Sequence, residues 1–273
     1  MNNTIGFIGT GNMGGALAKA AAKAVAPGRI RLSNKTAAKA EALAAELGCA
    51  SGSVQQVARE CGLIFLGVKP QMMQDLLCEI GPTLAIRQDT FVLVSMAAGL
   101  TMAEIQQMAG SKYPVIRVMP NTPVAVGQGV VMYDATENVT DAALDVFCES
   151  MRFAGLLDRL PEKLIDAGSA VAGCGPAFAC LFLEALADGG VACGLPRAKA
   201  MEYAAQMLRG TAALAMETGK HPGQLKDAVC SPGGSTIAGV RALEQSAFRA
   251  AAMEAVEAAF YRTRELGNPK SKG

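Results

Sequence analysis

The stretch that decides the fold is TIGFIGTGNMG at residues 4–14. Its first half is short and apolar, as in a buried strand, and an Ala-rich segment with helical spacing follows it. Between the two lies the pattern G-x-G-x-x-G, formed by Gly9, Gly11 and Gly14. The first glycine of such a turn permits the tight bend, the second lets the backbone approach a pyrophosphate, and the third lets helix and strand pack closely. This context favours a dinucleotide-binding turn over an ordinary tight turn.

The kind of dinucleotide is decided further along the chain. The predicted contacts within the turn are Ile8, Gly9, Thr10, Gly11, Asn12 and Met13. About 20 residues beyond the glycines, NAD enzymes carry an acidic residue on the ribose 2′-hydroxyl. This sequence has Asn34 and Lys35 there instead, and a cation with hydrogen-bonding neighbours suits the 2′-phosphate of NADP. We therefore predict NADP(H), bound by Asn34 and Lys35; the alternative is that Lys35 is a solvated residue of the next helix.

The pattern of strands and helices changes once along the chain. Short apolar runs at residues 4–8, 29–33, 63–68, 91–95 and 115–119 alternate with helical segments such as 13–25 and 35–47. This alternation predicts an α/β fold with a Rossmann-like, doubly wound parallel sheet, and 127–133 and 156–160 are candidate edge strands. After Pro161 the strand signals stop, and residues 162–171, 176–193, 197–218, 235–246 and 248–266 have helical patterns. We expect an NADP-binding domain at residues 1–160 and an all-helical domain at residues 161–273.

Three further segments follow predicted strands, at the carboxyl ends where open parallel sheets bind their ligands. They add the predicted cofactor-binding residues Val68, Lys69, Pro70, Ala97, Ala98, Pro120 and Asn121. Lys69 could contact the cofactor or simply cap a helix begun by Pro70. The segment 117–123 is stiffened by two prolines, and its small residues would suit a flat surface for the nicotinamide. A strand-ending turn is the alternative.

Composition excludes several classes of function. The chain has 273 residues and a net charge of +1, without a Lys/Arg run that could track a phosphate backbone, so we expect no nucleic acid partner. Eight Cys residues are scattered without a C-x-x-C pair, and His221 is the one histidine, which argues against a metal site and a His-based triad. No basic segment precedes the first apolar residues. These features predict a cytoplasmic protein with reduced thiols.

The second half contains an unusually apolar segment. Residues 167–183 are uncharged, but we expect Gly173, Gly175 and Pro176 to interrupt them, so no membrane span is predicted. Residues 178–191 form a helix that is apolar nearly all round and must be buried on most sides. A subunit interface and a central core helix explain this pattern equally well.

A second glycine-rich loop, CSPGGSTI at residues 230–237, precedes a predicted helix. Gly233 and Gly234 free the backbone, while Ser235 and Thr236 present N–H groups and hydroxyls at the helix start. Because the first domain already supplies a pyrophosphate site, this loop should bind a smaller anion, such as a substrate carboxylate. The alternative is an N-capped helix with a flexible lead-in.

These motifs together resemble the pyrroline-5-carboxylate reductase family. The segment 225–244, with SPGGSTI at 231–237, resembles the family's specific signature, and the motifs at residues 7–13, 68–70, 95–99 and 119–123 match in the same order. One departure is Cys174, where the family more often has Ser. The resemblance covers nearly the whole chain.

The resemblance implies an enzyme that makes L-proline by hydride transfer from NAD(P)H to Δ1-pyrroline-5-carboxylate, a cyclic imine carboxylate. It places the catalytic Thr236 near the ring nitrogen. The implied substrate-binding residues are Ser231, Gly233, Gly234, Ser235 and Thr236. It also implies a helical dimerisation domain and a homo-oligomer, either a dimer or a ring of dimers. The chemistry agrees with this sequence, because a protonated imine accepts hydride without a dedicated acid and needs mainly positioning.

Two rival functions remain. A β-hydroxyacid dehydrogenase has a similar N-terminus, but it places a catalytic Lys soon after a Gly-rich segment early in its second domain, and residues 173–180 contain no Lys. A non-catalytic NADP sensor would need only the nucleotide site, so the loop at 231–236 argues against it.

Overall fold

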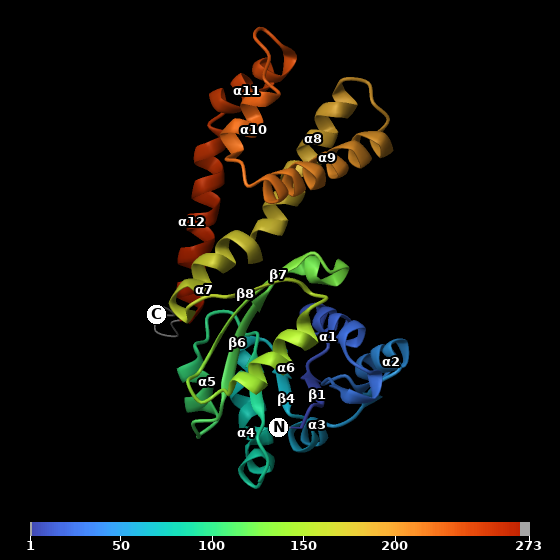
Figure 1. Cartoon of the computed structure of the whole chain (residues 1–273), viewed down its shortest axis with the longest axis vertical. Coiled ribbons are helices and arrows are strands. Elements are labelled where there is room, and N and C mark those ends of the chain that lie inside the picture. Colours follow the sequence, from blue (N-terminus) through green and yellow to red (C-terminus); the bar gives the residue numbers. More distant parts are fainter. Residues whose placement is uncertain (1, 268–273) are drawn as a thin grey trace. The chain divides into compact units, whose positions relative to one another are not determined.

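The computed structural model describes residues 2–267, which form two compact units. The first unit, the sheet unit, holds the chain up to Cys174 and the end of the last helix from Ala259, and the second, the helical unit, is Gly175–Ala258. Figure 1 labels the helices of both units and those strands of the sheet for which there is room.

The sheet unit is built on eight strands in the order β3-β2-β1-β4-β5-β6-β7-β8. Their bounds are β1 Ile5–Ile8, β2 Ile30–Ser33, β3 Ala50–Ser51, β4 Leu63–Leu66, β5 Val92–Ser95, β6 Val115–Pro120, β7 Gly129–Ala135 and β8 Gly155–Arg159. Strands β1 to β6 are parallel, with β1 between β2 and β4. This order places the end of β1 where the strand order reverses, the position at which such sheets bind ligands.

The predicted doubly wound fold is confirmed, with a correction at one edge of the sheet. Strand β7 pairs antiparallel with β6, and β8 then pairs parallel with β7, so the sheet is mixed. The physical reason is the connection: β6 and β7 are joined only by the short 3₁₀ segment η3, Thr122–Val126. A parallel return would need a much longer crossover. The short strand β3 carries no pattern that the sequence analysis detected.

Helices cover both faces of the sheet, which explains why every residue of β1, β4 and β5 is buried. One face packs against α1 (Asn12–Ala24), α2 (Ala37–Leu47) and α6 (Asp141–Met151), around stacked Phe7 and Phe65, whose ring centroids are 4.5 Å apart. The other face packs against α3 (Val54–Glu60), α4 (Met73–Ala85) and α5 (Met102–Met108).

A long helical run begins in the sheet unit and continues into the helical unit. Helix α7 (Glu162–Gly168) continues through a π-helical segment, Ser169–Gly173, into α8 (Gly175–Ala192). The expected interruption at Gly173 and Gly175 is therefore wrong. The helix absorbs the glycines by widening, because the Cys174 N–H donates to the Ser169 carbonyl at 2.9 Å, five residues back. By length and composition alone, Glu162–Ala192 could cross a membrane.

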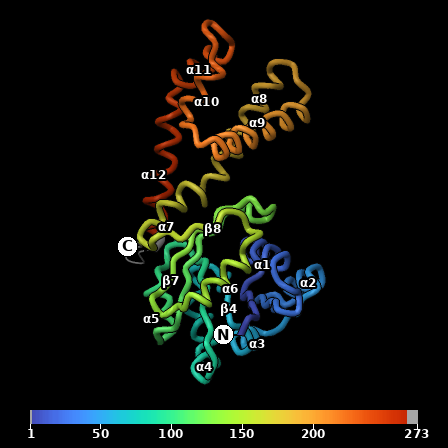
Figure 2. The backbone as a smooth tube through the Cα atoms, viewed as in Figure 1, coloured from blue at the N-terminus to red at the C-terminus, as the bar shows by residue number. Residues whose placement is uncertain are grey.

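The remaining helices are α9 (Arg197–Thr218), α10 (Pro222–Ala228), α11 (Ser235–Gln245) and α12 (Phe248–Gly267). Helices α8 and α9 pack side by side, as the backbone in Figure 2 shows. Yet Ala187 is the single buried residue of α8, and Leu181 is 69% exposed. Within one chain α8 is therefore no core helix, which argues against that explanation of its apolar pattern.

Candidate active site

The glycine turn after β1 has the geometry that its motif predicts. Gly9 has a φ of +98°, which favours glycine, and a Cβ there would lie 2.5 Å from the Gly67 carbonyl oxygen. A Cβ on Gly14 would lie 2.1 Å from the Gly9 carbonyl oxygen, so this glycine lets α1 approach the turn. Around Gly11, by contrast, no atom lies within 4 Å of a Cβ. The middle glycine thus faces open space, as a residue approached by a ligand would.

Backbone hydrogen bonds fix this turn to both neighbouring strands. The Gly9 N–H donates to the Ser33 carbonyl of β2 at 2.8 Å, and the Gly67 N–H after β4 donates to the Ile8 carbonyl at 2.7 Å. Gly11 is the N-cap of α1 and makes no side-chain capping bond. The first N–H groups of α1 have no partner within the helix, so they are free to bind an anion.

The side chain of Asn34 holds the turn from the side. Its Oδ1 accepts from the Thr10 N–H at 3.1 Å, and its Nδ2 donates to the Thr36 carbonyl at 3.2 Å. The Thr10 hydroxyl is buried without a hydrogen-bond partner among the described residues. A buried hydroxyl without a partner is costly, and a bound phosphate oxygen would satisfy it.

Two cavities adjoin the turn. One, of about 470 Å³, lies at the end of β2 and is lined by Ser33, Asn34 and residues 51–55, with the carboxylates of Glu41 and Glu79 also at its wall. The other, of about 540 Å³, extends from Thr10 and Gly11 along α1 and α2, and Lys19, Lys39 and Glu46 line it. The predicted Lys35 is exposed just before Thr36, the N-cap of α2.

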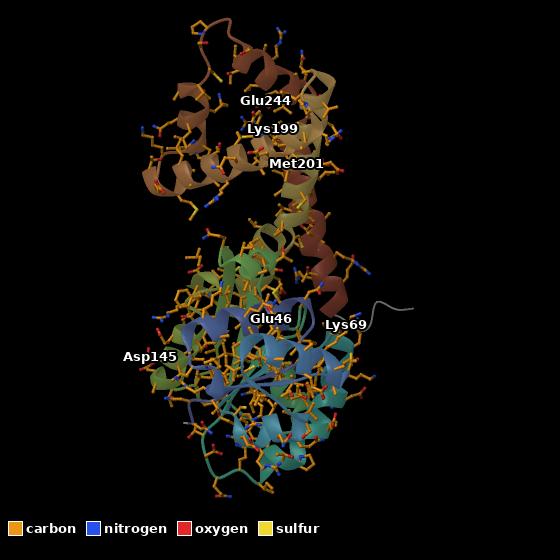
Figure 3. The ribbon with its side chains drawn as sticks, turned by 90° about the vertical axis from the view of Figure 1, so that its right-hand side faces the viewer. Glu46, Lys69, Asp145, Lys199, Met201 and Glu244 are labelled. Atoms are coloured by element: carbon orange, nitrogen blue, oxygen red, sulfur yellow. The ribbon has the colours of Figure 1, made fainter. Side chains whose placement is uncertain are left out.

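Lys39 is a candidate that the sequence analysis missed. It lies four residues after Lys35, in the first turn of α2, and a second lysine this close to the predicted contact was the available signal. Lys19 pairs with Glu46 at 2.8 Å. Figure 3 labels Glu46 and also Lys69, which is exposed before the 3₁₀ segment η2, Pro70–Met72, as its N-cap. Lys69 makes no side-chain cap bond, so its side chain is available to a ligand.

The two later loops differ in exposure. After β5, Ala97 is buried and its N–H approaches the Ser95 hydroxyl at 3.4 Å, whereas Ala98 is exposed. After β6, Pro120 is buried and Asn121 is 7% exposed. The Asn121 side chain donates to the Ala172 carbonyl at 2.9 Å and accepts from the Val130 N–H at 2.8 Å. The amide of Asn121 is therefore occupied by protein partners.

A buried ion-pair network lies next to this loop and was not foreseen. Arg117 of β6, 2% exposed, contacts the Asp166 carboxylate at 2.5 Å and that of Glu162 at 3.5 Å. The same Glu162 carboxylate accepts from the Met102 N–H at 2.7 Å. Arg117 is an isolated charge within an apolar strand, and nothing in the sequence pattern indicated which carboxylates would pair with it.

The second glycine-rich loop lies in the helical unit and leads into α11. Gly233 has a φ of +67°, and a Cβ on Gly234 would lie 2.4 Å from the Ser231 hydroxyl. Gly234 is the N-cap of α11, and no side chain caps it. Ser235 and Thr236 are exposed in the first turn. This helix N-terminus therefore presents free N–H groups and two hydroxyls, as an anion site requires.

His221 has a structural place instead of a catalytic one. Its Nδ1 accepts from the Gly223 N–H at 3.1 Å and so caps α10, while Gln224 bonds back to the His221 N–H at 3.2 Å. Among residues 2–267, no group of three or more His, Cys, Asp or Glu side chains is placed to hold a metal ion.

Comparisons with known proteins give consistent matches. Residues 162–266 match the family model for pyrroline-5-carboxylate reductase dimerisation, and residues 4–99 match that for coenzyme F420-dependent NADP oxidoreductase. A pyrroline-5-carboxylate reductase of Glycine max is 40% identical over 96% of both chains. That of Escherichia coli K12 is 40% identical over 97% of this chain and 99% of its own.

Solved structures agree with these sequence matches. A Plasmodium falciparum pyrroline carboxylate reductase with NADP bound has a TM-score of 0.86 at 32% identity, over 98% of this chain and all of that one. A Coxiella burnetii pyrroline-5-carboxylate reductase has a TM-score of 0.88 at 29% identity, over 98% of this chain and 100% of its own.

Proposed function

The chain belongs to the pyrroline-5-carboxylate reductase family and reduces Δ1-pyrroline-5-carboxylate to L-proline with NAD(P)H, and from this premise we propose the roles of its residues. The glycine turn at residues 8–13 binds the pyrophosphate through the free N–H groups of α1. The observation that supports this role is Gly11, where no atom lies within 4 Å of a Cβ. Asn34 holds the turn in place through its bond to the Thr10 N–H. The Thr10 hydroxyl, which has no partner among the residues that the structure describes, donates a hydrogen bond to a phosphate oxygen of the cofactor.

The remaining cofactor contacts come from the loops after three strands. Val68, Lys69 and Pro70 follow β4, while Ala97 and Ala98 follow β5. Pro120 and Asn121 follow β6 and present backbone to the nicotinamide, since the Asn121 side chain is already engaged.

For the finer choice of cofactor we propose NADPH over NADH. At the end of β2, where an NAD enzyme carries an acidic residue for the ribose 2′-hydroxyl, this chain has Asn34 and Lys35 instead. Lys35 is the residue that the sequence predicts for contact with the 2′-phosphate. Lys39, in the first turn of α2, is a second cation four residues further on, and it lines a cavity with Thr10 and Gly11.

The single observation that carries the substrate end is the uncapped N-terminus of α11. Its N–H groups, with Ser231, Gly233, Gly234 and Ser235, hold the substrate carboxylate. The Thr236 hydroxyl in the same turn then hydrogen-bonds the ring nitrogen and orients the imine carbon. The reduced cofactor supplies the hydride. The imine carbon gains that hydride while the C=N π electrons pass to the nitrogen, which already carries a proton as an iminium, and the amine of proline results.

The chain forms a homo-oligomer through its helical unit, as the matched dimerisation model and the exposed apolar side chains of α8 and α9 require. We propose a dimer or a ring of dimers. The match from residue 162 also supports the proposed domain boundary at Pro161, between residues 1–160 and 161–273. Burial in a protein interface accounts for the apolar run of α8, and we propose a cytoplasmic location.

The experiment on Thr236 tests the proposed division between the two glycine-rich loops. Thr236→Val keeps the shape of the side chain and removes the hydroxyl, while Thr236→Ser keeps the hydroxyl. We expect the first to lower kcat by about 10-fold or more with nearly unchanged NADPH affinity, and the second to retain much of the rate. Thr211→Val on α9, another exposed helical Thr, is the control. Normal turnover with lost NADPH affinity would assign the loop to the cofactor.

A further inference from the structure

The loop after β6 and the helical run that begins at Glu162 are tied together within the sheet unit. Arg117 and Asn121 lie four residues apart on β6 and its loop. Arg117 binds the Asp166 carboxylate of α7, and Asn121 binds the Ala172 carbonyl of the π-helical segment. We call the residues Arg117, Asn121, Glu162 and Asp166 the α7 clamp.

Two members of the clamp are buried and two are half-buried. Arg117 and Asn121 are 2% and 7% exposed, so water has little access to them, whereas the side chains of Glu162 and Asp166 are 25% and 26% exposed. Two carboxylates face the single Arg117 guanidinium, at 2.5 and 3.5 Å. Breaking such a buried pair from one side leaves an uncompensated charge, which is strongly unfavourable.

Asn121 binds a carbonyl that the helical run leaves without its regular donor. The residue four positions after Ala172 is Pro176, which has no N–H to donate to the Ala172 carbonyl. The Asn121 Nδ2 donates to this carbonyl instead, at 2.9 Å. Its Oδ1 accepts from the Val130 N–H of β7, so one side chain joins the loop, the next strand and the helical run.

We propose that Arg117 and Asn121 are positioning residues for hydride transfer. They hold the loop at Pro120, against which the nicotinamide is expected, in register with α7. This inference rests on the reductase activity and on the proposed place of the nicotinamide. Because reactive atoms must approach within about 3–3.5 Å, a loop displaced by about 1 Å slows the transfer much more than it weakens cofactor binding.

Asn121→Asp tests the proposal in the full-length enzyme. The substitution keeps an oxygen for the Val130 N–H but sets a second oxygen against the Ala172 carbonyl. We expect kcat to fall by about 10-fold or more while the NADPH dissociation constant changes by less than about 3-fold. The primary isotope effect on kcat with 4-deuterated NADPH should rise, because hydride transfer becomes rate-limiting. Loss of stability alone would not produce that rise.

Asp166→Ala and Asp166→Asn form a matched pair, since the amide oxygen of Asn still accepts from Arg117. We expect the Asn variant to keep more of kcat than the Ala variant. Thr140→Ala is the control, because it removes the N-cap bond of α6, in which no residue of the clamp takes part.

The possible results distinguish a positioning role from a direct contact and from a loss of stability. A normal kcat for Asn121→Asp overturns the proposal. A fall in kcat matched by an equal loss of NADPH affinity also overturns it, because Asn121 would then be a direct ligand of the cofactor. An equal loss in Thr140→Ala overturns it too, because stability would then explain the effect. An inactive wild type would refute the activity itself and not the clamp.

Discussion

Replacing Gly11 or Gly14 of the first turn by alanine should affect the stability of the protein differently. At Gly14 the new methyl carbon would lie 2.1 Å from the Gly9 carbonyl oxygen. Because Cβ atoms essentially never lie closer than 3.0 Å to another heavy atom, α1 and the turn must separate by about 1 Å. Such overpacking costs about 1–3 kcal/mol. At Gly11, with a φ of −69° and no atom within 4 Å, the protein without cofactor tolerates alanine.

Denaturant unfolding and NADPH titration distinguish the two variants. Gly11→Ala should unfold at the wild-type midpoint when NADPH is absent, yet bind NADPH at least about 10-fold more weakly, because the methyl group occupies the pyrophosphate's place. Gly14→Ala should lose both stability and affinity. If Gly11→Ala bound NADPH as tightly as wild type, the turn would not be the pyrophosphate site, and the predicted cofactor residues 8–13 would be wrong.

Two further changes test the cofactor choice and the assembly. Lys35→Glu and Lys39→Glu each place a carboxylate near one candidate site of the 2′-phosphate. The substitution at the lysine that contacts the 2′-phosphate should raise KM for NADPH by about 10-fold or more while KM for NADH changes little. Equal effects on both cofactors would exclude that lysine. Leu183→Lys puts a charge into the apolar surface of α8. The variant should elute as a smaller species on sizing chromatography and should have lost its activity in a separate assay. An active assembly of unchanged size would place Leu183 outside the interface.

The sheet was predictable because buried parallel strands leave a strong local signal. The runs that became β1, β2, β4, β5 and β6 are short, apolar and rich in β-branched residues, and each agrees with its strand within a few residues. The direction of β7 was not predictable in this way, since it depends on the length of the connection at η3. Helix α10 was missed because its cap is His221, an uncommon N-cap residue.

In the candidate site too, the sequence predicted local features but not contacts between distant residues. Motifs with local geometry, such as Gly9, Gly14 and Gly233, have the conformations that their patterns require. Partners far apart in sequence left no pattern. Asn34 was predicted as a cofactor ligand, and the structure adds its bond to Thr10, 24 residues away. Arg117 and Asp166 lie 49 residues apart, so only the fold brings their charges together.

The most direct test of the account is turnover by the wild-type enzyme. Purified protein is mixed with Δ1-pyrroline-5-carboxylate and NADPH, and both NADPH oxidation and the amino-acid product are measured. We expect one L-proline to form for each NADPH oxidised, with no oxidation when the imine is omitted. Tight NADPH binding without proline formation would contradict it and would leave a nucleotide-binding protein that does not catalyse the reduction.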